Sequence, residues 1–221
     1  MRFLPLVCLF FSTVVLAAPI TDSFNEEMYI FANPDVEELI KQGQYKSGLD
    51  HYTQVGQTTP RPDGELYETF FTGTAGNDTV QAFGEGAHTH VMGVDIELVK
   101  EHPDDFPLRF NNNGSGEVDV LIGVETGGNE FVLGSFITSV NTTAEAFYVG
   151  KGDEDYATIQ NFISGKDLLI LAGTPDQYSW ESLDGNMRVS TKDGDLIAIV
   201  EEVDKLEVGD VFEDMDMFTL N

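Results

Sequence analysis

A glycine-rich turn near residue 75 contains residue types that could bind a cation. It reads Gly73-Thr74-Ala75-Gly76-Asn77-Asp78-Thr79-Val80. Glycines permit a tight turn whose main-chain carbonyl groups can face an ion, and the Asp78 carboxylate adds an oxygen ligand of the kind that Ca²⁺ takes. Val80 would then begin a buried strand. A turn with Asn-Asp is also common without any ion, so the segment predicts a turn for which a cation is one of two interpretations.

Two later segments repeat this pattern imperfectly. In each, glycines precede an acidic residue and a run of apolar residues. The segments are Gly114-Ser115-Gly116-Glu117-Val118-Asp119-Val120-Leu121 and Gly127-Gly128-Asn129-Glu130-Phe131. The recurrence favours a common role for the three turns.

His88 and His90 offer a different chemistry, that of a transition metal. Side chains two residues apart on a strand point to the same face. The two imidazoles could therefore supply two ligands of a zinc or iron site, with Asp95 downstream. No second histidine motif accompanies them, and isolated motif matches often have no functional role.

Residues for covalent or phosphate chemistry are not apparent. The chain has no Gly-x-Ser-x-Gly or P-loop motif, and its single cysteine is Cys8. Its 39 acidic residues are too many for a glycosidase pair to be identified. Trp180 and the other aromatic residues fall on apolar strands, where core packing is favoured over a sugar-binding platform.

The elements that would position these residues are short strands after residue 64. Apolar runs at 120–123, 131–134, 147–150 and 168–173 each end at glycine. Such runs, bounded by Gly, Asn or Asp, are the signal for strands. Their repetition favours stacked rungs of an irregular β-solenoid, with an ordinary β-sandwich as the alternative. The residues expected to be buried are Leu121, Val132, Phe147, Ile170 and Ile199.

Local sequence patterns also predict hairpins near the C-terminus and short helices near the N-terminus. Asp184-Gly185 and Asp193-Gly194 predict hairpin turns between strands at 178–183, 187–191 and 196–200. Residues 19–62 are predicted to form a small helical module and a linker. There, Asn33-Pro34 predicts the start of one helix and Ser47 the cap of another. Residues 63–221 are expected to form one β-rich domain.

Charge limits the partners of the chain. The chain carries 39 acidic and 11 basic residues, a formal charge of −28. This balance disfavours binding to nucleic acid and to anionic membranes, and the self-repulsion favours neutralisation by cations. A solvated acidic surface that maintains solubility is the other interpretation.

Residues 1–18 have the pattern of a secretory signal peptide. Arg2 precedes an apolar run, and Ala17-Ala18 offers small residues for cleavage. The run is too short to cross a bilayer comfortably. The sequence therefore predicts a secreted protein without a membrane span, and without a disulfide, because Cys8 leaves with the signal.

From about residue 70 onward, the chain resembles the cyanobacterial-type branch of the hemolysin-type (RTX) calcium-binding proteins. The segments that carry this resemblance are 73–80, 116–123, 129–134, 155–173 and 196–200. Asn33-Pro34-Asp35-Val36, His51-Tyr52 and Gly56 are similar to a short helical module that often precedes such repeats. The family's regular repeats stack every nine residues, whereas Asp78 and Asp119 lie 41 residues apart.

The resemblance implies calcium as the cofactor. It places calcium at the turns that contain Asp78 and Asp119, with Glu130 as a third position. The implied metal-site residues are Gly76, Asn77, Asp78, Gly116, Asp119, Asn129 and Glu130.

Together these observations predict a mainly β, secreted, acidic calcium-binding protein with a structural or binding role and no catalysis. One alternative is an adhesion, matrix or carbohydrate-binding protein in which calcium is only structural. Another is a hydrolase or isomerase on an acidic β-scaffold. The expected partners are calcium ions and a cell-surface or matrix ligand.

Overall fold

The computed structural model describes residues 23–85, 88–99 and 107–221. The predicted signal peptide, 1–18, lies outside these residues. The described chain is mainly β, with three short α-helices before the first strand. In the described part of the chain, no helix is long and apolar enough to cross a membrane.

The predicted helices near the N-terminus are present. They are α1 (Glu26–Ala32), α2 (Pro34–Lys41) and α3 (Gly48–His51), which continues into a π-helix at Tyr52–Gly56. Ser47 caps α3 as expected, because its hydroxyl accepts the Asp50 N–H at 3.1 Å. Pro34 occupies the first turn of α2, but the Asn33 side chain does not cap that helix.

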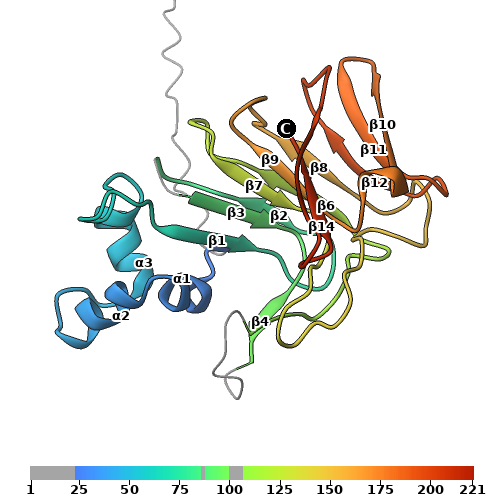
Figure 1. Ribbon diagram of the computed structural model, residues 1–221. Coiled ribbons are helices and arrows are strands. Elements are labelled where there is room, and N and C mark those ends of the chain that lie inside the picture. The colour runs from blue at the N-terminus through green and yellow to red at the C-terminus, as the bar shows by residue number, and fades with distance from the viewer. Residues whose placement is uncertain (1–22, 86–87, 100–106) are drawn as a thin grey trace, which may run out of the picture.

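Asn33 instead joins the helices to the first strand, β1 (Glu68–Thr72). Its buried amide Nδ2 donates to Tyr29 O at 2.6 Å and to Glu68 O at 2.7 Å. Phe24 pairs with Phe71 in an isolated antiparallel bridge and stacks on Tyr52. The helical module is thus fastened to the free edge of β1, at one end of the molecule (Figure 1).

Two six-stranded sheets make up the body of the protein. The first has the order β1-β3-β7-β9-β14-β13 and the second has the order β10-β11-β12-β8-β6-β2. A small hairpin, β4 and β5, is inserted between β3 and β6. The remaining bounds are β2 (Thr79–Gln81), β3 (His88–Met92), β4 (Ile96–Leu98), β5 (Leu108–Phe110), β6 (Val118–Ile122), β7 (Asn129–Val132), β8 (Tyr156–Gln160), β9 (Leu168–Ala172), β10 (Tyr178–Leu183), β11 (Asn186–Thr191), β12 (Leu196–Val200), β13 (Val208–Phe212) and β14 (Met217–Leu220).

The chain alternates between the two sheets. Apart from the β4–β5 hairpin, it runs β1, β2, β3, β6, β7, β8 and β9, and each of these strands lies in the other sheet from the one before it. β10, β11 and β12 then follow within the second sheet, where β12 lies beside β8. Within each sheet, the alternating strands pair in parallel with their neighbours, and β12 pairs in parallel with β8. The turns that connect them therefore fall into two rows. We call the turns that lead into β2, β6, β8 and β12 the first turn row, and those that lead into β3, β7 and β9 the second turn row.

The core lies between the sheets and follows the register of the parallel strands. In the first sheet, Phe71, Val91, Phe131 and Leu169 form one buried column across four strands. In the second sheet, Val80, Leu121, Ile159 and Val200 form its counterpart. Large apolar side chains meeting in register exclude water from the whole length of the body.

Two expectations about individual segments are wrong. Residues 147–150 do not form a strand: Tyr148 has a left-handed backbone with φ 57°, and its ring turns into the interior. Ile199 is only half-buried, because it pairs with Thr158 on the outer face of the second sheet. Leu121, Val132, Phe147 and Ile170 are buried as predicted, and both Asp-Gly hairpins are present.

Candidate functional site

The first turn row brings together acidic residues that are far apart in the sequence. Because β2 and β6 are parallel neighbours, the Asp78 N–H donates to Asp119 Oδ1 at 2.8 Å. Between the same two turns, the Val118 N–H donates to Asn77 Oδ1 at 2.9 Å, and the Gly76 N–H donates to Glu117 Oε1 at 2.9 Å. The predicted residues around Asp78 and Asp119, 41 positions apart, are thus adjacent in space.

Asp119 is fully buried, and both of its carboxylate oxygens accept hydrogen bonds from the protein. Its Oδ2 accepts the Tyr148 hydroxyl at 2.6 Å, opposite the bond to Asp78. Burial is the main reason that the pKa of Asp119 is raised to about 6. Nearby Glu117 and Asp78 raise it further, and the two hydrogen bonds lower it. Gly93 leaves the space for this pair, because a Cβ there would lie 2.1 Å from Asp119 Oδ2.

Asp155 occupies the next position along the same row. Its Oδ2 accepts the Gly116 N–H at 3.0 Å, so a third turn is attached to the second. The side chain is fully buried, and its Oδ1 has no hydrogen-bond partner among the described residues. A buried carboxylate oxygen without a partner is energetically costly. Among the described residues of the first turn row, this oxygen is the buried side-chain atom that has no hydrogen-bond partner.

The second turn row holds Asn129, which the sequence grouped with Asp78 and Asp119. Its backbone N–H donates to Asp167 Oδ1 at 2.9 Å and its side-chain Nδ2 to Asp167 Oδ2 at 3.1 Å. Asn129 Oδ1 accepts the Val124 N–H, and Asp167 Oδ2 also accepts the Ile163 N–H. Both side chains are buried and all their oxygen atoms are satisfied. Asn129 therefore lies apart from the first turn row, in a self-contained hydrogen-bond network.

Glu130 is placed in a different cluster, on the outer face of the first sheet. Glu68 pairs with His88 across β1 and β3, and His90 pairs with Glu130 across β3 and β7. The four side chains form a closed ring in which each carboxylate contacts both imidazoles. His88 Nδ1 and His90 Nε2 lie 3.1 and 2.8 Å from the two Glu68 oxygens. His88 Nε2 and His90 Nδ1 lie 2.5 and 3.1 Å from the two Glu130 oxygens.

The charges in this cluster stabilise one another. Hydrogen bonds to Glu130 and Glu68 raise the pKa of His88 to about 10, and the same contacts raise that of His90 against the effect of burial. Burial alone would raise the pKa of Glu68, but hydrogen bonds from the two histidines lower it to about 2. The pKa of Glu130 is lowered for the same reason. With no other ion bound, the cluster is a pair of carboxylates facing a pair of imidazolium groups.

The sequence pattern indicated the histidine pair, but it did not indicate the two carboxylates that contact the pair. Among all histidine, cysteine, aspartate and glutamate side chains in the described residues, Glu68, His88 and His90 are the one group of three whose ligand atoms lie within 4.8 Å of one another. Glu68 lies in no motif and is the first residue of the aromatic strand β1, so no local signal marked it. Asp95, which lies downstream of the histidine pair in the sequence, is not part of this group: its Oδ2 accepts the Asn111 side-chain amide.

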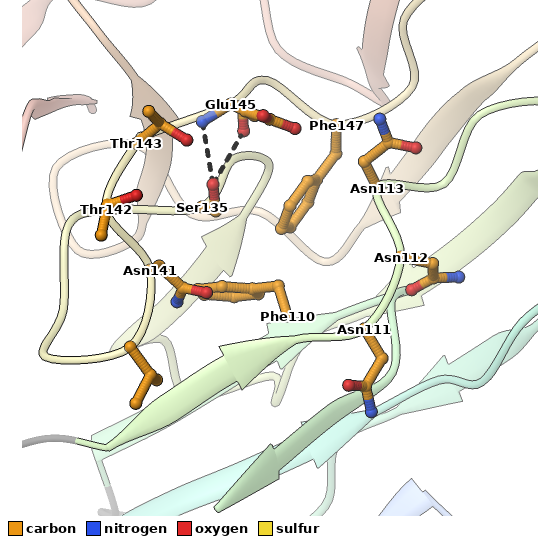
Figure 2. Close-up of a pocket in the computed structure, with 11 residues that line it drawn as sticks. Phe110, Asn111, Asn112, Asn113, Ser135, Asn141, Thr142, Thr143, Glu145 and Phe147 are labelled. Atoms are coloured by element: carbon orange, nitrogen blue, oxygen red, sulfur yellow. Dashed lines mark hydrogen bonds between the residues drawn. The ribbon is translucent and has the colours of Figure 1, made fainter. Parts of the chain in front are cut away.

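A polar groove lies beside the loops of the first turn row (Figure 2). It is lined by Phe110, Phe147 and several asparagine, serine and threonine residues. Asn141 Nδ2 donates to Leu108 O, and Ser135 Oγ accepts the Glu145 N–H. Phe147 is fully buried, so its face is not available for stacking against a sugar. These groups hold the loops together, and we assign no ligand to the groove.

Comparisons with known proteins leave the family open. The chain matches no family model, no curated protein and no solved structure. The assignment of a function to this protein therefore depends on the residues and contacts described above.

Proposed function

We propose that this protein is a secreted, acidic β-domain that binds calcium at its first turn row, where the ion has a structural role. The residues that would hold the ion belong to successive turns. Asp155 Oδ1 would be one ligand. The neighbouring turns, which contain Glu117, Asp78 and Asn77, would supply further carboxylate, amide or main-chain oxygens. Oxygen ligands of this kind suit Ca²⁺.

The observation that carries the proposal is the unsatisfied Oδ1 of Asp155. It is fully buried without a donor, in a row of turns that already holds Asp78, Glu117 and Asp119. A cation would satisfy this oxygen and offset the repulsion between the carboxylates. The formal charge of −28 adds a general attraction for cations over the whole molecule.

We also propose that the parallel strands form an irregular two-sheet solenoid. The alternation of the chain between the sheets supports this, as does the separation of hydrogen-bonded turn residues by 41, 39 and 43 positions along the first turn row. Each rung would then be between four and five times the length of the nine-residue repeat of the RTX family, with the loops and the β4–β5 hairpin as insertions. In this arrangement the ions would lie between neighbouring turns, as the resemblance implies.

Calcium should stabilise the fold more than an equal ionic strength of sodium does. Extracellular sites commonly have dissociation constants of about 10⁻⁴ to 10⁻³ M, so millimolar calcium should contribute on the order of 1 kcal/mol for each occupied site. The melting temperature of the full chain, measured by circular dichroism in CaCl2 and in matched NaCl after chelator treatment, gives the difference. Calorimetric titration with CaCl2 gives the number of sites.

Three aspartate variants serve this experiment, and Asp155→Asn and Asp167→Asn among them form a matched pair. Asp155→Asn should remove most of the calcium-specific increase, and Asp78→Ala part of it. Asp167→Asn changes an equally buried aspartate in the second turn row, whose oxygens are already satisfied. It should lower the melting temperature but leave the calcium-specific increase intact. Identical curves in calcium and in matched sodium for the unsubstituted protein would show that the turns bind no calcium.

A further inference from the structure

We propose that Glu68, His88 and His90 form a binding site for a divalent transition-metal ion, with zinc as the representative ion, and that Glu130 positions both imidazoles. This site is independent of the calcium proposal, because it shares no residue with the first turn row and lies on the outer face of the first sheet. Its ligand set differs in kind as well. Imidazole nitrogen is a ligand of zinc and other first-row transition ions, whereas calcium takes oxygen.

The first argument is the spacing of the three proposed ligands. His88 Nδ1 and His90 Nε2 lie 3.1 and 2.8 Å from separate oxygens of Glu68. Ligand atoms on a tetrahedral zinc ion, about 2.0 to 2.1 Å from the metal, are roughly 3.3 Å apart. The ligand atoms of all three side chains lie within 4.8 Å of one another. They are therefore close enough for side-chain movements to bring them around one ion, which would replace the protons now shared between them.

The second argument is the use of the remaining nitrogen atoms. His88 Nε2 and His90 Nδ1 both face Glu130, at 2.5 and 3.1 Å from its two oxygens. In metal sites, the ligating histidine usually donates its second N–H to a carboxylate, which fixes the tautomer and strengthens the metal bond. Here one carboxylate does this for two histidines at once, so each imidazole would direct its free nitrogen toward Glu68.

The third argument is the rigidity of the frame and its access to solvent. The His90 ring stacks on Phe70 with ring centres 4.5 Å apart and planes 8° from parallel. All four residues lie on three hydrogen-bonded parallel strands, which fix their relative positions. The side chains of His88 and Glu68 are 40% and 37% exposed, whereas His90 and Glu130 are each 17% exposed. An ion can thus enter from the Glu68 side, where water can complete its coordination.

Zinc and cobalt titrations of the full chain test this proposal. After chelator treatment, calorimetry with ZnCl2 should show saturable binding of one equivalent, and CoCl2 should give the intense visible absorption of a low-coordinate cobalt ion with nitrogen ligands. Millimolar calcium should leave the zinc affinity unchanged. Long-range ¹H–¹⁵N spectra of the unsubstituted protein should show the ring signals of two histidines changing with the first equivalent of zinc. This readout does not depend on any variant folding.

Variants separate the ligands from the positioning residue. His90→Ala and Glu68→Ala should abolish saturable zinc binding. Glu130→Gln should weaken it by about 10- to 100-fold, and Glu130→Asp should recover part of that loss. Asp95→Asn is the matched control, since its carboxylate lies near the histidines in sequence but outside the cluster, and it should bind zinc as the unsubstituted protein does. Absence of saturable zinc binding, or no change in any histidine ring signal, would show that the cluster is an ion-pair network without a metal and would overturn the proposal.

Discussion

Asp119, Asp155 and Asp167 are three equally buried aspartates that differ in their hydrogen bonds. All three are fully inaccessible to solvent, and each accepts a backbone N–H from the neighbouring turn. The second oxygen distinguishes them. It is satisfied by Tyr148 in Asp119 and by Asn129 and Ile163 in Asp167, but it has no partner in Asp155. Burial and residue type alone would not have separated the structural aspartates from the proposed calcium ligand.

Replacing Tyr148 with phenylalanine tests the structural role of Asp119. Tyr148→Phe removes the 2.6 Å hydrogen bond and leaves a buried carboxylate oxygen unpaired, which should cost about 1 to 3 kcal/mol of unfolding free energy at neutral pH. Since that bond lowers the pKa of Asp119, the pKa should rise above its present value of about 6. The loss should therefore be smaller at pH 5, where the Asp119 carboxyl group is mostly protonated in both folded proteins and the oxygen left unpaired carries no charge.

Urea unfolding of both proteins in chelator, at pH 7 and at pH 5, measures this difference. The double variant with Asp119→Asn is the control, because the two effects should not add if the residues act on each other. If Tyr148→Phe lowered the unfolding free energy equally at both pH values, the lost hydrogen bond to Asp119 would not be the cause of the destabilisation.

At the scale of elements, a buried histidine connects two helices of the helical module. His51 ends α3 and is almost fully buried, with its Nδ1 2.9 Å from the Tyr29 hydroxyl of α1. Burial lowers the pKa of His51 below its ordinary value of 6.5. The imidazole is therefore neutral in the folded protein at physiological pH, and the rings of Tyr45 and Tyr67 pack against it.

Mild acid should destabilise the protein through His51. As the pH falls below about 6.5, the unfolded chain binds a proton that the buried imidazole resists, so the contribution of His51 to stability is complete above 6.5 and is lost below it. Unfolding free energies of the unsubstituted protein and of His51→Gln, measured in urea from pH 7.5 to pH 5, should converge as the pH falls. Parallel curves would show that His51 does not titrate in this way. The difference between the two unfolding free energies is used because other groups, common to both proteins, also titrate between pH 7.5 and pH 5.

At the scale of the whole molecule, the acidic surface opposes the compact fold. The chain has 39 acidic and 11 basic residues, and several of its ion pairs are exposed, such as Lys41 with Glu37 and Arg109 with Glu97. Exposed pairs of this kind contribute little to stability. The core between the two sheets and the backbone ladders must therefore hold the fold against a general repulsion.

Salt should raise the stability of this protein at neutral pH. Increasing NaCl from about 0.01 to 1 M shortens the screening length from roughly 30 to 3 Å and so weakens the repulsion between carboxylates. The melting temperature in chelator should rise over this range. The same series near pH 4 is the control, because the isoelectric point is about 4.1 and the repulsion is small there. A rise of equal size at both pH values would point to general salt effects on hydrophobic burial rather than to charge.

The sequence by itself determined the local structure of this protein. Glycine, asparagine and aspartate marked the turns, and apolar runs marked most strands, because backbone conformation and the burial of one face are properties of a few neighbouring residues. Pro34 and Ser47 identified helix starts for the same reason. The run at 147–150 is an exception. It is apolar because Phe147 and Tyr148 fill the interior from a loop, and the apolar pattern alone does not distinguish such a loop from a strand.

Only the tertiary structure decided which turns and which side chains meet. Asp78 and Asp119 became neighbours, while Asn129 went to the other turn row and Glu130 to the outer face of the first sheet. These placements depend on the pairing register of parallel strands about 40 residues apart, which is set by the packing of the core and by the loops inserted between strands. For the same reason the sequence showed His88 and His90 as a pair, but only the pairing of β1, β3 and β7 placed Glu68 and Glu130 around them.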